Sequence, residues 1–315
     1  MLQQIDYVLS KLAWMRRERI WPNGLRYLWT DAFGVVLLVS LHRRLGDARW
    51  LDEAEELVAD VERVLGRERG LRIGQAPDRD GQYFHYLAMW LFALARLGDH
   101  RPAYRARAVA LAKDIHSAFV IPGLGVIWKM TEDLSGPYRG HGLGALDAFD
   151  GYVAYRLLDE AALAPEIAQM RELVEAQYAA LDIDQDLGLG MMLWLAHFFP
   201  GEDWARVQTE RCLEALGALW IDPPGYFGRS RRQRHVRIAF ANYGVSLGLQ
   251  AANRWPERAE RLNAHFEAYR SGDEYDTEAI THVMACTSHF PGAFLASDAT
   301  RGGPAKAARL PPAAP

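Results

Sequence analysis

Residues 29–66 read WTDAFGVVLLVSLHRRLGDARWLDEAEELVADVERVLG, and this stretch decides the fold. Its first half, residues 33–41, is apolar nearly all round, which is typical of a helix that is buried on every side. A short turn over residues 46–49 leads into a segment whose apolar residues recur at a spacing of three and four, with acidic residues between them. The stretch therefore predicts a helical hairpin made of one buried helix and one amphipathic helix.

The same unit recurs along the chain. Amphipathic segments lie at roughly 3–17, 50–66, 102–119, 165–179, 202–219 and 256–270. The apolar segments between them begin near Thr30, Gln82, Asp147, Gly190, Val236 and Thr277. Turns that leave the apolar segments are short, whereas loops that enter them, notably 67–81, 120–146 and 220–235, are mostly long. This alternation predicts an all-α protein, an (α/α)6 toroid of six helical hairpins with the long, function-bearing loops on one face.

Composition favours one large domain. Half of the 315 residues are hydrophobic, which is enough to bury a sizeable core. No linker rich in Pro, Gly or Ser interrupts the helical pattern, so we expect a single toroid domain over residues 1–297. Residues 298–315 are rich in Ala and Pro and are expected to form a disordered tail.

Charge and cysteine content narrow the class of partners. A net charge of −4 provides no general attraction to nucleic acid or to an anionic membrane. The apolar runs are shorter than a membrane span, and the N-terminus has no secretory signal. Cys212 and Cys286 are not at metal-binding spacing. We therefore expect a cytoplasmic protein with a small-molecule or oligosaccharide ligand, without nucleic-acid or membrane partner, metal or cofactor, and with no indication of its oligomeric state.

Polar residues in the first turns of the apolar segments are the candidate catalytic groups. Because all inner helices of a toroid start on the same face, we expect Asp31, His85, Asp150 and His282 to border one cavity there. Asp150 follows Phe149 and precedes Gly151, which leaves room for a ligand beside it. An apolar setting raises the pKa of a carboxyl group and suits it to act as a general acid.

Each of these residues also has a structural interpretation. Asp31 and Asp147 are residue types that cap helices, and capping is the favoured interpretation for Asp147. His85 and His282 are also compatible with buried histidines that hold a single structural hydrogen bond. In a non-catalytic toroid, the polar residues at the helix starts would serve only as caps.

Further residues are candidates for substrate binding. Aromatic rings at Trp29, Tyr83 and Trp128 are placed to stack on a sugar. Residues 229–237 form the one strong basic cluster, which is either a solvated loop or a clamp for a carboxylate or phosphate on the ligand. The clamp interpretation predicts an anionic ligand. The remaining substrate-binding candidates are Lys129, His141, Arg231, His235 and Asn242.

With its hairpin count, loop asymmetry and acidic and aromatic helix starts over residues 1–296, the chain resembles the six-hairpin glycosidase-like superfamily. That group includes inverting glycoside hydrolases, unsaturated uronyl hydrolases, polysaccharide lyases and sugar 2-epimerases. The resemblance implies a glycoside hydrolase for a small or anionic sugar, with Asp150 as the principal acid or base and Asp31 as its partner at the roughly 6.5–9.5 Å of an inverting pair. An epimerase or lyase that uses His85 and His282 is the alternative. A non-catalytic ligand-binding or scaffold toroid is the second alternative.

Overall fold

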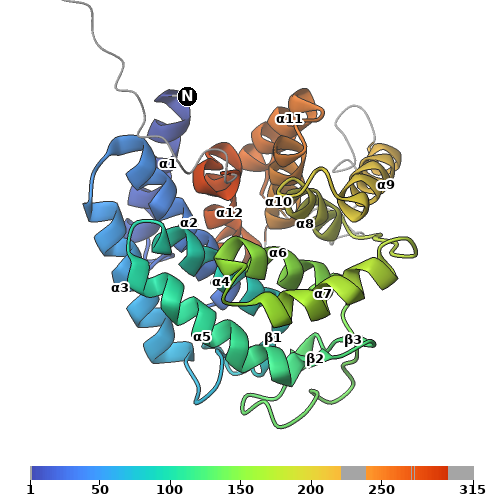
Figure 1. Ribbon diagram of the computed structural model, residues 1–315. Helices are drawn as coiled ribbons and strands as arrows, with labels where there is room; N and C mark the ends of the chain where they lie inside the picture. Colours follow the sequence, from blue (N-terminus) through green and yellow to red (C-terminus); the bar gives the residue numbers. More distant parts are fainter. Residues whose placement is uncertain (1, 221–238, 271, 273, 297–315) are drawn as a thin grey trace, which may run out of the picture.

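The computed structural model describes residues 2–220, 239–270, 272 and 274–296, and it confirms the all-α toroid (Figure 1). Twelve α-helices are present in this part of the chain. The outer helices are α1 (Leu2–Arg17), α3 (Arg49–Leu65), α5 (Pro102–Phe119), α7 (Ala164–Gln177), α9 (Asp203–Leu219) and α11 (Pro256–Ala268). The inner helices are α2 (Leu28–Leu45), α4 (Phe84–Gly98), α6 (Asp147–Asp159), α8 (Asp186–Ala196), α10 (Ala239–Ala251) and α12 (Ala279–His289). The tail expected at 298–315 lies outside the described residues.

The helices follow one another around a ring in chain order. Odd-numbered helices occupy the periphery in Figure 1 and even-numbered helices lie inside. Helix α12 packs against both α10 and α2, and α1 packs against α12, so the two ends of the chain close the ring. Among neighbouring inner helices, α6 and α8 make the weakest contact.

Burial follows the predicted patterns. In α2 every residue from Leu28 to Leu41 is buried. In α3 the buried residues instead recur at a helical spacing on one face, as an outer helix requires. Pro102, Pro165 and Pro256 lie at the first positions of α5, α7 and α11, where a missing backbone donor costs nothing.

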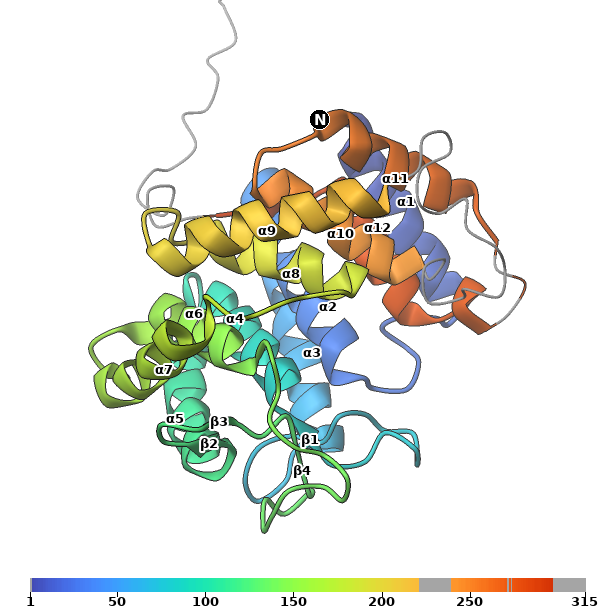
Figure 2. The same cartoon turned by 90° about the vertical axis from the view of Figure 1, so that its right-hand side faces the viewer.

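The long loops are tied to one another. Strand β1 (Gln82–Tyr83) pairs with β4 (Lys129–Met130), and β2 (Val120–Ile121) pairs with β3 (Gly125–Val126), both antiparallel (Figure 2). The Glu132 carboxylate forms ion pairs with the guanidinium groups of Arg67 and Arg72, each at 2.8 Å. The buried side chain of Gln82 donates to the carbonyl of Glu132 at 2.7 Å. These cross-links hold the loop before α4 against the loop before α6.

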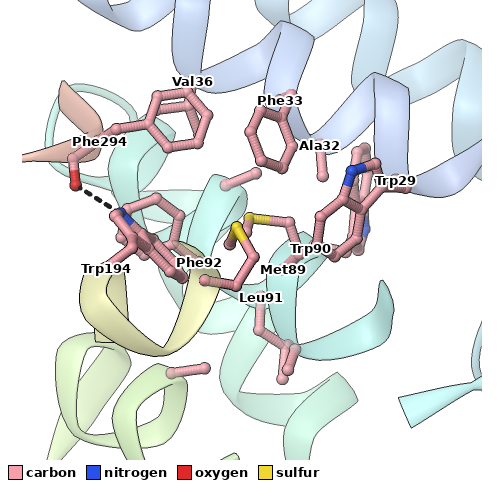
Figure 3. Close-up of a cluster of buried hydrophobic side chains, with 14 of the residues drawn as sticks. Trp29, Ala32, Phe33, Val36, Met89, Trp90, Leu91, Phe92, Trp194 and Phe294 are labelled. Atoms are coloured by element: carbon pink, nitrogen blue, oxygen red, sulfur yellow. Dashed lines mark hydrogen bonds between the residues drawn. The ribbon is translucent and has the colours of Figure 1, made fainter. Parts of the chain in front are cut away.

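A short 3-10 turn closes the opposite end of the ring. This turn, η4 (Gly292–Phe294), follows α12, whereas the other 3-10 turn, η3 (Glu274–Asp276), precedes it. Phe294 is fully buried and its ring lies 4.8 Å from Phe33 and 6.0 Å from Phe92 (Figure 3). Trp194 Nε1 donates to the Phe294 carbonyl at 3.0 Å. Phe294 thus joins α2, α4 and α8 at the centre.

Glycines allow α8 and α10 to approach closely. A Cβ atom on Gly190 would lie 2.5 Å from the carbonyl oxygen of Gly244, and one on Gly248 would lie 2.2 Å from that of Gly190. Any side chain at either position would push the two helices apart.

We expect Phe294→Ala to lower the free energy of unfolding by about 3–5 kcal/mol, because it leaves a cavity where three inner helices meet. Urea unfolding followed by circular dichroism measures the change. The matched control is Leu124→Ala, since Leu124 is exposed on the β2–β3 turn. Equal stability of the two variants would show that η4, the turn that carries Phe294, does not hold the ring together.

Candidate functional site

The imidazole of His85 lies in a wall of aromatic rings at the start of α4. Its centroid is 4.5 Å from Tyr86, 5.5 Å from Tyr83 and 5.8 Å from Trp29. The side chain of His85 keeps 31% of its surface exposed. Tyr83 is still extended and helix α4 begins at Phe84, so Tyr83, His85 and Tyr86 all lie at the helix start. An accessible imidazole with fixed neighbours is a suitable general base.

Asp147 lies beside this imidazole. Its Oδ1 is 3.9 Å from Nδ1 of His85, and the carboxylate is buried. No residue in the described part of the chain hydrogen-bonds to this oxygen. The interpretation of Asp147 as a helix cap is wrong, because Leu146 is the N-cap residue of α6 and no side chain caps this helix start. The Asp147 carboxylate instead lies beside His85 and packs against Gly144, where a Cβ would be 1.8 Å from Oδ2. In an imidazole whose Nδ1–H faces a carboxylate, Nε2 is the basic nitrogen.

The aromatic wall continues onto the loop before α6. The Trp128 ring lies 5.0 Å from Tyr83 and 4.4 Å from His141. Lys129 is buried, with Nζ 3.8 Å from the Tyr138 ring centroid and 3.4 Å from Oδ1 of Asp80. Because Asp80 balances its charge, Lys129 holds the loop in place and the rings of Trp128 and His141 remain at the surface of the wall.

Asp150 lies one turn further into α6. It lines a cavity of about 10 Å³, the space of one water molecule, where α6 and α8 separate. Part of its surface opens into this cavity, but protein atoms surround the carboxyl group densely. This burial, followed by the negative charge of Asp147, raises the pKa of Asp150 well above the ordinary value. The other lining residues are Ala88, Met89, Phe92, Val153, Ala154, Trp194 and Leu195.

The space expected beside Gly151 is filled by protein. A Cβ at this position would lie 2.6 Å from the Cε of Met170 and 3.0 Å from the ring of Phe84. Gly151 therefore lets α6 pack against α7 and α4, and the expectation that it leaves room for a ligand is wrong.

Asp31 faces away from the aromatic wall. Its carboxylate accepts Trp21 Nε1 at 3.0 Å and the backbone N–H of Tyr27 at 3.1 Å, and it pairs with Arg26 at 3.4 Å. The bond to Tyr27 is the reach-back half of a helix-capping arrangement. Burial raises the pKa of Asp31 to about 6, against the opposing effects of Arg26 and Trp21. The expected sharing of a cavity with Asp150 is not observed, since Asp31 is enclosed on the side of Arg26.

His282 also points away from the aromatic wall. Its ring packs 4.7 Å from Trp14 of outer helix α1, and Nε2 donates to the carbonyl of Asp276 at 3.0 Å. Asn242 is fully buried on α10, across the ring from α4. Arg231 and His235, like the basic stretch 229–237, lie outside the described residues. The structure thus groups Trp29, Tyr83, His85, Trp128, Lys129 and His141, places Asp150 one turn deeper, and separates Asp31 and His282 from them.

Several residues of the wall do not stand out in the sequence. Tyr86 was accessible to sequence reasoning, because it shares a helical turn with His85. Tyr138 and Asp80 lie on two different loops, where no periodicity relates them, yet Tyr138 donates a hydrogen bond to Asp80. Only the folded chain brings these two together.

Among the described residues, no group of three or more His, Cys, Asp or Glu side chains is arranged to hold a metal ion. In the same part of the chain, no helix is both long and apolar enough to cross a membrane.

Comparison with known proteins supports the fold. No protein-family model matches the chain, and no curated protein matches it in sequence. Among solved structures, the chain is similar to a cellobiose 2-epimerase from Bacillus thermoamylovorans, with a TM-score of 0.56 and 10% sequence identity over 85% of this chain and 88% of that one. The six-hairpin toroid expected from the sequence is thereby confirmed as the fold.

The buried state of His282 predicts a dependence of stability on pH. Burial, followed by the nearby Lys11, lowers its pKa from 6.5 to about 4. As the pH falls, His282 is therefore protonated in the unfolded chain before it is protonated in the folded protein. The stabilisation that neutral His282 provides is complete above pH 6.5 and is lost as the pH falls toward 4. At about 1.4 kcal/mol per pKa unit the loss reaches about 3 kcal/mol. His282→Asn should flatten the unfolding free energy between pH 7 and pH 4, measured in urea, while the half-buried His141→Asn should follow the wild type.

The raised pKa of Asp150 predicts the opposite dependence of stability on pH. Because its folded-state pKa is raised, the folded protein loses stability as the pH rises through that value. Asp150→Asn removes the charge and keeps the shape, so it should raise the free energy of unfolding by about 1 kcal/mol or more at pH 8 and by less at pH 4. Asp184→Asn, at an exposed position before α8, is the control and should change neither value. A destabilised Asp150→Asn protein at pH 8 would show a structural role for this carboxyl group.

Proposed function

We propose that this protein is a sugar-processing enzyme that moves a proton at a carbon next to a carbonyl, as a sugar epimerase or isomerase does. The observation that carries the proposal is the accessible imidazole of His85 beside the buried carboxylate of Asp147, at 3.9 Å. Trp29, Tyr83 and Trp128 form a wall on which a sugar ring can stack. The fold that the chain shares with a cellobiose 2-epimerase is consistent with this chemistry, although fold alone does not fix a reaction.

In the proposed reaction, His85 Nε2 takes the proton from the carbon next to the carbonyl of an open-chain sugar. The C–H electron pair moves into the carbonyl and forms an enediolate. Asp147 stabilises the imidazolium, since an opposite charge within about 4–6 Å favours the charged form. We propose Asp150, whose pKa burial raises well above the ordinary value, as the acid that returns a proton to the intermediate. Return of a proton to the opposite face of the same carbon reforms the carbonyl and inverts that carbon. Return to the former carbonyl carbon, with transfer of the proton from the neighbouring hydroxyl to the enediolate oxygen, isomerises the sugar. Proton exchange with water then restores neutral His85 and protonated Asp150.

Glycoside hydrolysis is the second candidate, and the raised pKa of Asp150 favours it as a general acid. An inverting hydrolase also needs a second carboxylate that is open to water. Asp31 is fully buried and holds Trp21, Tyr27 and Arg26, so it does not meet that requirement. This difference makes proton transfer at carbon the better-supported reaction.

Solvent exchange distinguishes the two reactions. Reducing sugars, including glucose, mannose, galactose, cellobiose and their uronic acids, are incubated with the protein in D2O. Proton NMR then follows the signal of the hydrogen at C2. We expect deuterium to replace this hydrogen in at least one sugar, together with appearance of its epimer or ketose. Release of the aglycone from aryl glycosides without any deuterium incorporation would instead identify a hydrolase.

In this assay His85→Asn should lower the exchange rate by roughly 10²-fold or more, because it removes the base. Asp147→Asn should lower it less, since the imidazole remains in place. The melting temperature of both variants should stay near that of the wild type. The control is His42→Asn, because His42 lies in the last turn of α2, at the end of the ring away from the wall. Exchange that survives His85→Asn at the wild-type rate would exclude His85 as the base.

A further inference from the structure

Arg79 lies at the edge of the aromatic wall. Its guanidinium carbon is 5.0 Å from the ring centroid of Tyr27, and its Nη1 is 3.5 Å from the Tyr27 hydroxyl. The hydroxyl groups of Tyr27 and Tyr86 hydrogen-bond to each other. The Tyr86 ring in turn lies 4.5 Å from the imidazole of His85. A continuous series of contacts therefore joins the cation of Arg79 to the proposed base.

The backbone fixes the position of Arg79. The N–H of Gly74 donates to the carbonyl of Arg79, and the N–H of Arg79 donates to the carbonyl of Ala76, both at 3.0 Å. Gly74 leaves space for the stem, since a Cβ at this glycine would lie 2.9 Å from the Cβ of Arg79 and 3.1 Å from the ring of Tyr27. The aliphatic part of the Arg79 side chain is thus packed, while 44% of the whole side chain stays exposed.

The structure offers Arg79 little to balance its charge. Its one ion pair within the described residues is with Asp78, at 3.8 Å, and 78% of the Asp78 side chain is exposed. Exposed pairs of this kind contribute about 0–1 kcal/mol. Lys129 differs, because it is buried and paired with Asp80. On this wall Arg79 therefore has guanidinium donors available for a ligand.

We propose that Arg79, with the hydroxyl groups of Tyr27 and Tyr86, binds the carboxylate of an acidic sugar, and that the substrate is a uronic acid. This inference rests on the proposed function and names its substrate class. A planar guanidinium matches a carboxylate through two parallel hydrogen bonds. When one tyrosine hydroxyl of the pair donates to the other, the accepting hydroxyl keeps its own proton for the ligand.

The surrounding charges favour a carboxylate over a phosphate. Burial acts to lower the pKa of Arg79, but nearby groups, which include the acids Asp78 and Glu278, raise it overall. The same acids repel a ligand with two negative charges more than a ligand with one. A monoanionic carboxylate is therefore the better match.

Isothermal titration calorimetry with matched pairs of sugars tests this assignment. The pairs are glucose with glucuronate and galactose with galacturonate, and glucose 6-phosphate serves as the dianion. We expect the wild type to bind at least one uronate about tenfold or more tightly than its neutral partner, as a charge-assisted hydrogen bond provides. Arg79→Gln should abolish this preference without weakening neutral-sugar binding, and Arg79→Lys should keep part of it. Added salt should weaken only the uronate complex.

Arg17→Gln is the control for loss of one positive charge, because Arg17 is exposed on α1 and pairs with Glu18. It should leave the preference for uronate intact. The inference is overturned if uronates bind no more tightly than neutral sugars, if the preference survives Arg79→Gln, or if glucose 6-phosphate binds more tightly than glucuronate. Solvent exchange separates it from the proposed function. Exchange of neutral sugars without a uronate preference rejects only the substrate class, and uronate binding without exchange rejects only the reaction.

Discussion

The middle stretches of the inner helices are buried on every side, and the rest of the structure depends on that constraint. In α2 every residue from Leu28 to Leu41 is buried, so an unpaired charge in the middle of the helix would be costly. Among the described residues, charged groups of the inner helices therefore lie toward the helix ends. At the starts of the inner helices, long loops add further side chains and the helix dipoles add a positive potential. The candidate site lies there because the interior of the ring is closed to it.

The centre of the ring and its long-loop face have different roles. At the centre Phe294 joins α2, α4 and α8 through ring contacts and the hydrogen bond from Trp194 (Figure 3). At the long-loop face the loops before α4 and α6 are tied together by Glu132, Gln82 and Lys129. These links position the aromatic rings without a ligand. Pre-organisation of this kind reduces the ordering that binding would otherwise require.

The toroid supports several reactions, so the direction of individual side chains decides between them. Asp31 is occupied by Trp21, Tyr27 and Arg26, so it is not open to water as the second carboxylate of an inverting hydrolase would be. Asp147 is instead directed at His85, and this pair is suited to proton transfer. The weak contact between α6 and α8 leaves the cavity in which Asp150 is desolvated. Helix packing has therefore separated three similar aspartates into three different environments.

The sequence by itself determined the helices and their order, because hydrophobic periodicity reports directly which faces are buried. It also identified the helix starts and most of the aromatic wall, including Trp29, Tyr83 and Trp128. Only the tertiary structure decided where each polar side chain points. His282 turns to Trp14 and Asp31 to Arg26, whereas Asp147 turns to His85. Spacing along a helix sets the face on which a residue lies, but the partner on that face comes from a distant segment, and only folding brings it there.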